Sequence, residues 1–261
     1  MLRALTTAAA GMEAQQTQLD VTANNIANVS TAGFKKSRAE FADLMYQTMR
    51  PAGAATGNGT AAPSGLEVGL GVRVTTTQRL MSQGELRQTG NSRDLAIQGR
   101  GYFEVTLPSG ETAYTRNGAL QLDANGLLVT SEGYPIAGEI TVPREAQSLT
   151  IAADGKVTAT VAGDPAPIEL GQLQLTTFAN PAGLEGLGGT LFRATAAAGD
   201  AVTGNPGEEG AGSLLSGSLE LSNVSAVEEM IDLISGQRAY EVNTRVIKAA
   251  DEMLGQTAQL R

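Results

Sequence analysis

Large hydrophobic side chains recur at helical spacing through the first 28 residues of the chain. They lie seven residues apart, at Leu5, Met12, Leu19 and Ile26. A second set with the same spacing is mostly small or polar, and comprises Leu2, Ala9, Gln16 and Ala23. This pattern predicts one amphipathic helix that ends near Asn28, and its small positions allow a second helix to approach closely.

The last 37 residues carry another apolar stripe and predict a longer helix. Ser225 and Glu228 have the spacing of a capping box, in which each side chain bonds the backbone amide of the other residue. Arg238 interrupts the stripe, whose apolar members are Val227, Ile231, Ile234, Val242, Val246, Met253 and Leu254. Each helix needs a partner to cover its stripe, so the two helices pack on each other, on other copies of the chain, or on both.

Between the helices the pattern changes to the alternation that is typical of β-strands, as at 103–107, where Phe, Val and Leu are separated by polar residues. Asn117-Gly118 predicts a hairpin that joins strands at 113–116 and 119–122. Asn125-Gly126 and Asp154-Gly155 predict two further turns. We therefore expect mostly antiparallel strands over residues 70–178.

The distribution of proline and glycine separates the middle of the chain from its ends. All 9 prolines lie between Pro51 and Pro206, and 27 of the 32 glycines lie between residues 51 and 216. Two stretches rich in small residues, 50–65 and 196–213, predict flexible loops. The predicted fold class is α+β: a discontinuous domain of paired N- and C-terminal helices in a coiled coil, and a mainly antiparallel β-rich central domain.

The composition excludes several classes of chemistry. The 261 residues include no Cys, His or Trp. Without Cys and His the chain has no disulfides, no thiolate nucleophile, no histidine-based triad and no metal site built on these ligands. The net charge of −9 argues against general binding of nucleic acid. We predict no metal, no cofactor and no nucleic-acid partner.

A few charged residues still require an interpretation. Two acidic pairs, Asp94 with Glu104 and Glu208 with Glu209, are what a carboxylate-based wall hydrolase would use, but solvated surface carboxylates are far commoner. The chain is therefore not predicted to be an enzyme. The basic cluster of Lys35, Lys36 and Arg38 is typical of loop salt bridges or of contact with an acidic neighbouring subunit. The N-terminus lacks the apolar run of a secretory signal peptide.

Three amides crowd the end of the first predicted helix, at Asn24, Asn25 and Asn28. Capping and turn chemistry explains one asparagine at such a place well, but it explains three poorly. Amides on several faces of a helix end can also bond to the backbone and side chains of adjacent copies.

The sequence around these amides resembles a known motif. Residues 23–28 (ANNIAN) with residues 31–35 (TAGFK) resemble the N-terminal motif of the bacterial flagellar axial proteins, which form the rod and the hook. Residues 222–232, 237–241 and 248–254 resemble the C-terminal helix of the same family. Central segments such as GRGYF at 99–103 and LDANG at 122–126 also fit, so the resemblance covers essentially the whole chain.

Within this family the chain is most similar to distal rod members, because most hook proteins are longer. The resemblance implies an inner coiled-coil domain of residues 1–30 with 220–261, and an outer β-rich domain of residues 96–215. A connecting β-rich segment of residues 31–95 would include the Gly/Ala-rich stretch at 47–65, which resembles the stretch that separates distal rod from hook. A proximal rod or hook paralogue is the alternative assignment.

The resemblance also implies a function and partners. The chain is expected to polymerise helically with itself into a tubular drive shaft that crosses the periplasm to the outer membrane. Its expected partners are the proximal rod proteins, the hook protein, the surrounding P-ring and L-ring proteins, and the type III export apparatus, which exports it without a cleaved signal peptide. The predicted assembly interface comprises Leu5, Met12, Leu19, Asn24, Asn25, Ile26, Asn28, Val227, Ile231, Ile234, Val242, Val246, Met253 and Leu254.

Overall fold

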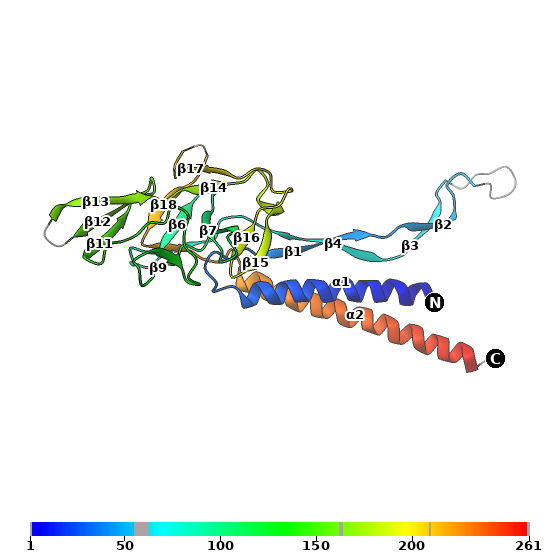
Figure 1. Ribbon diagram of the computed structural model, residues 1–261. Helices are drawn as coiled ribbons and strands as arrows, with labels where there is room; N and C mark the ends of the chain where they lie inside the picture. Colours follow the sequence, from blue (N-terminus) through cyan, green and yellow to red (C-terminus); the bar gives the residue numbers. More distant parts are fainter. Residues whose placement is uncertain (1, 55–62, 162–163, 209, 260–261) are drawn as a thin grey trace. The chain divides into compact units, whose positions relative to one another are not determined.

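The computed structural model describes residues 2–54, 63–161, 164–208 and 210–259 (Figure 1). The contacts divide the chain into two compact units. We call the first the helical unit; it comprises Met1–Ala27, Ser37–Gln78 and Ser225–Arg261. The second, the β-rich unit, comprises Asn28–Lys36 and Arg79–Val224. Residues 55–62 of the Gly/Ala-rich stretch lie outside the described residues.

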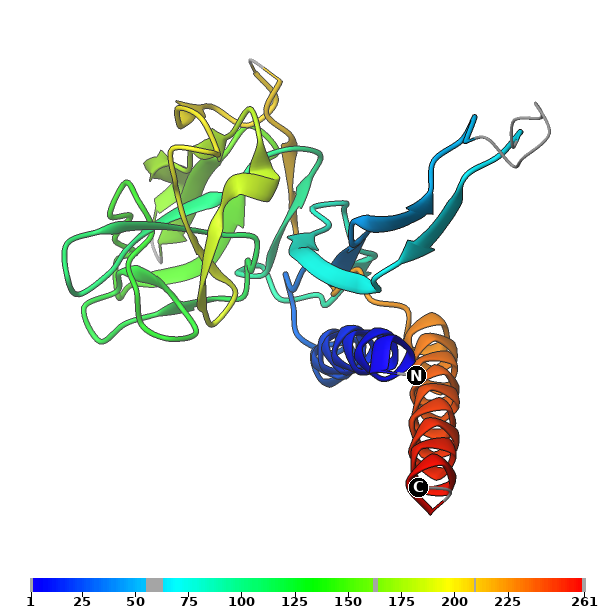
Figure 2. The ribbon, with the colours of Figure 1, turned by 90° about the vertical axis from the view of Figure 1, so that its right-hand side faces the viewer.

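Two long helices dominate the helical unit and confirm the prediction from the apolar stripes. Helix α1 spans Leu2–Ala27 and helix α2 spans Ala226–Gln259. They lie side by side and run antiparallel, because the start of α1 adjoins the far half of α2 while Asn25 reaches Glu229 (Figures 1 and 2). The Ser225 hydroxyl accepts a hydrogen bond of 3.5 Å from the Glu228 amide, which is the predicted serine half of the capping box.

The strands of the helical unit form a long ribbon beside α1 (Figure 1). Its strands are β1 (Ser37–Asp43), β2 (Tyr46–Arg50), β3 (Leu66–Gly69) and β4 (Val72–Arg79). β1 pairs with β4, and β2 pairs antiparallel with β3. Gly71 packs against α1, where a Cβ at this position would lie 3.2 Å from the Ala10 side chain.

The β-rich unit consists of small sheets. A four-stranded sheet has the order β15 (Glu185–Gly188), β16 (Leu191–Arg193), β8 (Thr112–Thr115) and β7 (Phe103–Thr106). A three-stranded sheet contains β11 (Ala146–Ile151), β12 (Lys156–Val161) and β13 (Asp164–Gln172). The two-stranded sheets pair β9 (Leu120–Leu122) with β10 (Leu128–Thr130), β14 (Leu175–Thr177) with β17 (Val202–Gly204), β18 (Ser213–Ser216) with β6 (Leu95–Gln98), and β19 (Ser218–Glu220) with β5 (Leu86–Gln88). A short 3-10 helix spans Pro181–Gly183.

One hydrophobic core joins most of these sheets. Its most buried members are large and apolar, and include Leu95, Ile97, Phe103, Val105, Val157, Leu173 and Leu175. A second cluster of aromatic side chains stacks edge to face, with 4.9 Å between the ring centres of Tyr114 and Phe178. The strand pairs with a defined register are all antiparallel, as the alternating pattern predicts.

The turn predictions have mixed outcomes. Asn125-Gly126 connects β9 with β10 and Asp154-Gly155 connects β11 with β12, so both turns are confirmed. The hairpin at Asn117-Gly118 is wrong, because β8 pairs with β7 and β16 whereas β9 pairs with β10. Gly118 serves another purpose: a Cβ there would lie 1.8 Å from the Leu95 carbonyl oxygen, so only glycine permits this backbone approach.

The predicted loop at 196–213 is also partly wrong. It contains β17, which pairs in register with β14 from Leu175↔Gly204 to Thr177↔Val202. Small residues with little hydrophobic pattern therefore form a strand here because a neighbouring strand supplies its hydrogen-bonding partners.

Candidate assembly interface

Helices α1 and α2 meet through small residues. A Cβ at Gly236 would lie 3.0 Å from the Cδ2 atom of Leu19, and a Cβ at Gly11 would lie 3.0 Å from the Nδ2 atom of Asn243. Both glycines therefore allow the helices to approach closely. Ala8, Ala14 and Ala250 are buried in the same unit. This contact buries little apolar area, because most of the large apolar side chains of α2 lie outside it.

At the three positions of the second heptad set whose burial is described, the predicted close approach does not occur within the chain. Ala9, Gln16 and Ala23 are all exposed, because the face of α1 that carries them points away from both α2 and the β1–β4 ribbon. The larger residues Leu5, Met12, Leu19 and Ile26 are half-buried beside this face. We call the exposed side of α1 its outward face.

Asn25 holds the base of the helical unit together. Its side chain is buried; its Nδ2 group donates to the Ser37 carbonyl (2.9 Å) and to the Glu229 carboxylate (3.1 Å), and its Oδ1 atom accepts from the Ser37 amide (2.9 Å). All polar atoms of this amide are therefore used inside the chain. Asn28 accepts a hydrogen bond from the Thr31 hydroxyl (3.2 Å), as in an ordinary turn. Asn24 is exposed.

Helix α2 carries its large apolar side chains on the side opposite α1. Val227 is 64% exposed, Ile231 61% and Val242 53%. Ile234, Val246 and Met253 are exposed in the same way, whereas Leu254 is half-buried. Successive helical residues turn by about 100°. Val227, Ile231, Ile234, Arg238, Val242 and Arg245 therefore share one face, which we call the outward face of α2. Exposed patches of this kind mark surfaces that bind other molecules.

The strand ribbon of the helical unit is also apolar at its surface. Its exposed large side chains are Phe41, Met45, Tyr46, Met49, Leu66, Val68 and Leu70. The pattern at 70–178 did not indicate this ribbon, most of which lies before residue 70, and β2 and β3 bury none of their side chains. A two-stranded ribbon with exposed apolar residues is itself only marginally stable alone.

Three charged side chains are buried together in the β-rich unit. The Lys35 ammonium contacts the Glu220 carboxylate at 2.5 Å, and the Arg116 Nε atom lies 3.0 Å from the other oxygen of that carboxylate. The Lys35 and Glu220 side chains are inaccessible to solvent. Glu220 also accepts from the Gly84 amide (2.9 Å), and Lys35 donates to the Ser82 carbonyl (2.7 Å). We call these three residues the ion triad.

Two members of the ion triad lie near the helices in the sequence. Lys35 follows α1 by a few residues, and Glu220 ends the last strand before α2. Burial lowers the pKa of Lys35, and the nearby Arg116 lowers it further, while Glu220 acts in the opposite direction. The salt-bridge interpretation of the basic cluster is confirmed for Lys35, and Arg38 pairs with Glu40 at the surface. The triad fixes the two segments that connect to the helices.

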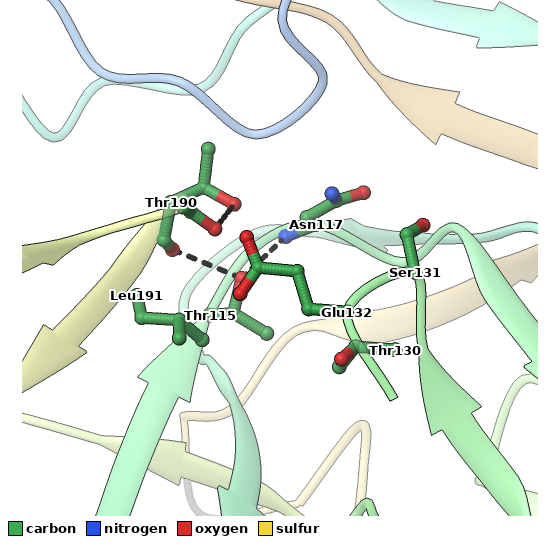
Figure 3. Close-up of a pocket in the computed structure, with 8 residues that line it drawn as sticks. Thr115, Asn117, Thr130, Ser131, Glu132, Thr190 and Leu191 are labelled. Atoms are coloured by element: carbon green, nitrogen blue, oxygen red, sulfur yellow. Dashed lines mark hydrogen bonds between the residues drawn. The ribbon is translucent and has the colours of Figure 1, made fainter. Parts of the chain in front are cut away.

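The β-rich unit also has a small polar pocket of about 70 Å³. Figure 3 shows Glu132 extending across it between Thr190 and Asn117, above the end of β8. The Thr115 hydroxyl donates to the Thr190 carbonyl (3.0 Å) and accepts from the Asn117 amide (3.0 Å). These groups therefore satisfy one another in a connection between strands, and the pocket has room for little more than water.

The carboxylates of the hydrolase alternative take part in ordinary contacts. Asp94 accepts from the Asn91 amide (3.1 Å), Glu104 accepts from the Thr176 hydroxyl (3.2 Å), and Glu208 accepts from Asn205 (3.2 Å). Glu209 lies outside the described residues. Within the described part of the chain, no group of three or more acidic side chains is arranged to hold a metal ion. Neither α1 nor α2, as far as they are described, is long and apolar enough to span a membrane.

Three family models match separate parts of the chain. Residues 5–35 match "Flagella basal body rod protein", residues 96–159 match "Flagellar hook protein FlgE/F/G D1 domain", and residues 215–260 match "Flagellar basal body rod FlgEFG protein C-terminal". The matched parts include most of both helices and a portion of the β-rich unit.

Curated relatives match along the whole chain. The flagellar basal-body rod proteins FlgG of Caulobacter vibrioides and of Buchnera aphidicola from Schizaphis graminum are each 48% identical, with 100% of both chains covered. FlgG of Bacillus subtilis is 41% identical over the same share of both chains. A flagellar hook protein FlgE of Helicobacter mustelae is 45% identical over 53% of this chain and 31% of its own.

Proposed function

Because the chain belongs to the family of flagellar basal-body rod proteins FlgG, it is a structural subunit of the rod, and we propose that it polymerises helically into the distal rod. The polymer acts as a tubular drive shaft that transmits torque from the motor to the hook. The subunit acts mechanically and catalyses no reaction.

The exposed outward face of α2 carries this proposal. At ~25 cal/mol per Å², taking a large apolar side chain from full exposure to full burial gains roughly 1.5–3 kcal/mol, and covering Ile231, which is 61% exposed, gains part of this. α2 packs small residues against α1 and leaves most of its large apolar side chains exposed. This arrangement favours assembly, in which other copies cover those side chains. The interface then contains the α2 residues Val227, Ile231, Ile234, Val242, Val246, Met253 and Leu254. It also contains Leu5, Met12, Leu19, Asn24 and Ile26 of α1 and the following Asn28, while the buried Asn25 supports it from inside the chain through its bonds to Ser37 and Glu229.

The proposal includes an arrangement and a location. Residues 1–30 with 220–261 form the inner coiled-coil domain of the rod, residues 31–95 connect it, and residues 96–215 form the outer domain. The rod crosses the periplasm to the outer membrane. Its neighbours are the proximal rod, the hook, and the P-ring and L-ring, and the type III apparatus exports the subunit without a cleaved signal peptide.

An exposed isoleucine on α2 provides the test. Ile231→Asp puts a charge on the outward face without disturbing contacts inside the chain, so the subunit should fold and be exported but form no rod. Burying an unpaired carboxylate at every copy costs several kcal/mol each time. The measurements are swimming and electron microscopy of isolated basal bodies from cells that carry only the variant.

The matched control is Ile168→Asp in the β-rich unit, where the isoleucine is 43% exposed. It introduces the same charge and should leave rods intact. Normal rods with Ile231→Asp would refute assembly through α2. The distal position is tested by deleting the gene: a basal body that ends at the proximal rod supports it, and a complete rod that lacks only the hook refutes it.

A further inference from the structure

The outward faces of α1 and α2 carry opposite charges at matching intervals. On α2, Arg238 and Arg245 are seven residues apart; on α1, Glu13 and Asp20 are also seven residues apart. Seven residues are about two helical turns, or ~10.5 Å along the axis. All four side chains are exposed in the single chain. Two cations and two anions therefore lie at the same spacing on two different helices.

The charges lie on the sides of the helices that face away from the contact between α1 and α2. Gly236 and Asn243 contact α1, and each is followed two residues later by an arginine, Arg238 or Arg245. Two residues turn the helix by about 200°, so both arginines point away from α1. On α1, Glu13 likewise follows Gly11 by two residues, and Asp20 precedes the buried Thr22 by two residues. The outward face of α2 thus points away from α1, and these four charges cannot pair with one another in a single copy.

The antiparallel pairing of the helices fixes their relative heights. Leu19 lies opposite Gly236, and the sulfur of Met12 lies 3.7 Å from the Thr244 hydroxyl. By this register Asp20 is level with Arg238, and Glu13 with Arg245, to within one helical turn of ~5.4 Å. A neighbouring copy placed beside the first at nearly the same height, with the same polarity, brings each arginine opposite a carboxylate.

The residues around the charges are also complementary in size. The outward face of α2 is bulky, with Ile231, Ile234 and Val242 exposed. The outward face of α1 has smaller side chains: Gln16 is exposed between its two carboxylates, and Ala9 and Ala23 are exposed on either side of them. Small residues let another helix approach closely, which is what the heptad pattern of α1 predicts and what α2 of the same chain does not use.

We propose that the outward face of α2 in one copy packs against the outward face of α1 in the next, with Arg238 opposite Asp20 and Arg245 opposite Glu13. This inference rests on the proposed function and specifies the contact through which the polymer grows. The contact joins two different surfaces, so each added copy leaves one of each surface free at the ends. Such a head-to-tail contact cannot close into a pair of copies, and it generates a helical polymer when the repeated rotation does not close a ring.

The ion pairs serve mainly to fix the register. Exposed ion pairs add little affinity, and Arg245 already has an exposed contact with Glu241 at 3.8 Å. Facing like charges, however, are strongly unfavourable and suppress wrong pairings. Apolar cover between the isoleucines and the alanines supplies the affinity, and the charges select which helix and which height are used.

Charge reversal tests the pairing directly. Asp20→Arg alone and Arg238→Asp alone should each reduce the number of rods per cell roughly tenfold or more, because like charges then face each other. The double variant Asp20→Arg with Arg238→Asp restores the opposite charges and should restore rods and swimming. Rods that form normally with either single variant, or a double variant as defective as the singles, would overturn the pairing while leaving the rod function intact.

Chemical crosslinking gives an independent readout, because the natural chain contains no cysteine. A chain with Asp20→Cys and Arg238→Cys, treated with a short bismaleimide in isolated basal bodies, should give a ladder of multiples on a denaturing gel. The control chain with Asp20→Cys and Gln237→Cys has its second thiol about 100° further round α2 and should give single chains. A dimer from Arg238→Cys alone would show α2 against α2 and overturn the proposal. If rod function itself fails, the chain is absent from basal bodies altogether.

Discussion

The helical unit and the β-rich unit place their large apolar side chains in opposite ways. Among the described residues of the helical unit, the buried apolar residues are all alanines: Ala8, Ala14, Ala39 and Ala250. The β-rich unit instead buries leucine, isoleucine, valine and aromatic side chains, such as Phe103 and Leu95. Most of the large apolar side chains of the helical unit, including Ile231 and Met45, are exposed.

This difference shows how the two units are stabilised. Each fully buried large apolar side chain contributes roughly 1.5–3 kcal/mol, whereas alanine contributes much less. The β-rich unit therefore has a core of its own. The helical unit has only the framework of a core, formed by close helix contact and by the buried Asn25, and it gains its apolar stabilisation when other surfaces cover it. One unit is a self-contained domain and the other is part of an interface.

The largest expected effect comes from the ion triad of the β-rich unit. Glu220→Gln removes the carboxylate that neutralises Lys35 and Arg116 and leaves two buried cations unpaired. We expect the free energy of unfolding to fall by at least about 3–5 kcal/mol, measured by denaturant titration of the purified chain. The control is Glu185→Gln, which breaks an exposed pair with Arg193 (2.7 Å) and should change stability by less than about 1 kcal/mol. Equal effects at the two sites would contradict the role of burial.

A pair of truncations compares the two units directly. Phe103→Ala in the core of the β-rich unit should cost about 3–5 kcal/mol in the unfolding of the purified chain, because it leaves a cavity. Ile234→Ala on the outward face of α2 should change the same measurement by less than about 0.5 kcal/mol, since this side chain is already half-exposed. A large loss of stability with Ile234→Ala in a verified monomer would show that α2 is covered within the chain.

The smallest effect concerns the pH dependence of the triad. Burial lowers the pKa of Lys35 in the folded protein below its ordinary value of 10.5. At a pH between the lowered pKa of the folded protein and 10.5, the unfolded chain binds more protons than the folded protein. The free energy of unfolding therefore rises with pH in this window. The unfolding free energy of the natural chain should therefore rise, relative to that of Lys35→Met, between neutral pH and 10.5. Lys156→Met, at an exposed lysine, is the control, and a flat or falling difference for Lys35→Met would contradict the prediction.

Local pattern was sufficient where the signal concerns neighbours in the sequence. The apolar stripes predict both helices, the alternation predicts antiparallel strands, and the turns at Asn125-Gly126 and Asp154-Gly155 lie where expected. Asn117-Gly118 has the same turn chemistry and yet connects two different sheets. The reason is that β8 finds partners on both edges, in β7 and in the distant β16, and no local signal reports that competition.

Two terminal helices with apolar stripes around a β-rich body follow from the residue pattern alone, because helical and strand periodicity are local properties of the chain. The sequence also carries the motifs that place the chain in its family. Which side of each helix faces its partner depends instead on contacts between residues that are distant in the sequence. Gly11 and Gly236 set the close contact inside the chain, and this turns Val227, Ile231 and Val242 outward. Likewise, Lys35, Arg116 and Glu220 are far apart in the sequence, and their burial together depends on strands whose pairing is fixed only in the folded chain.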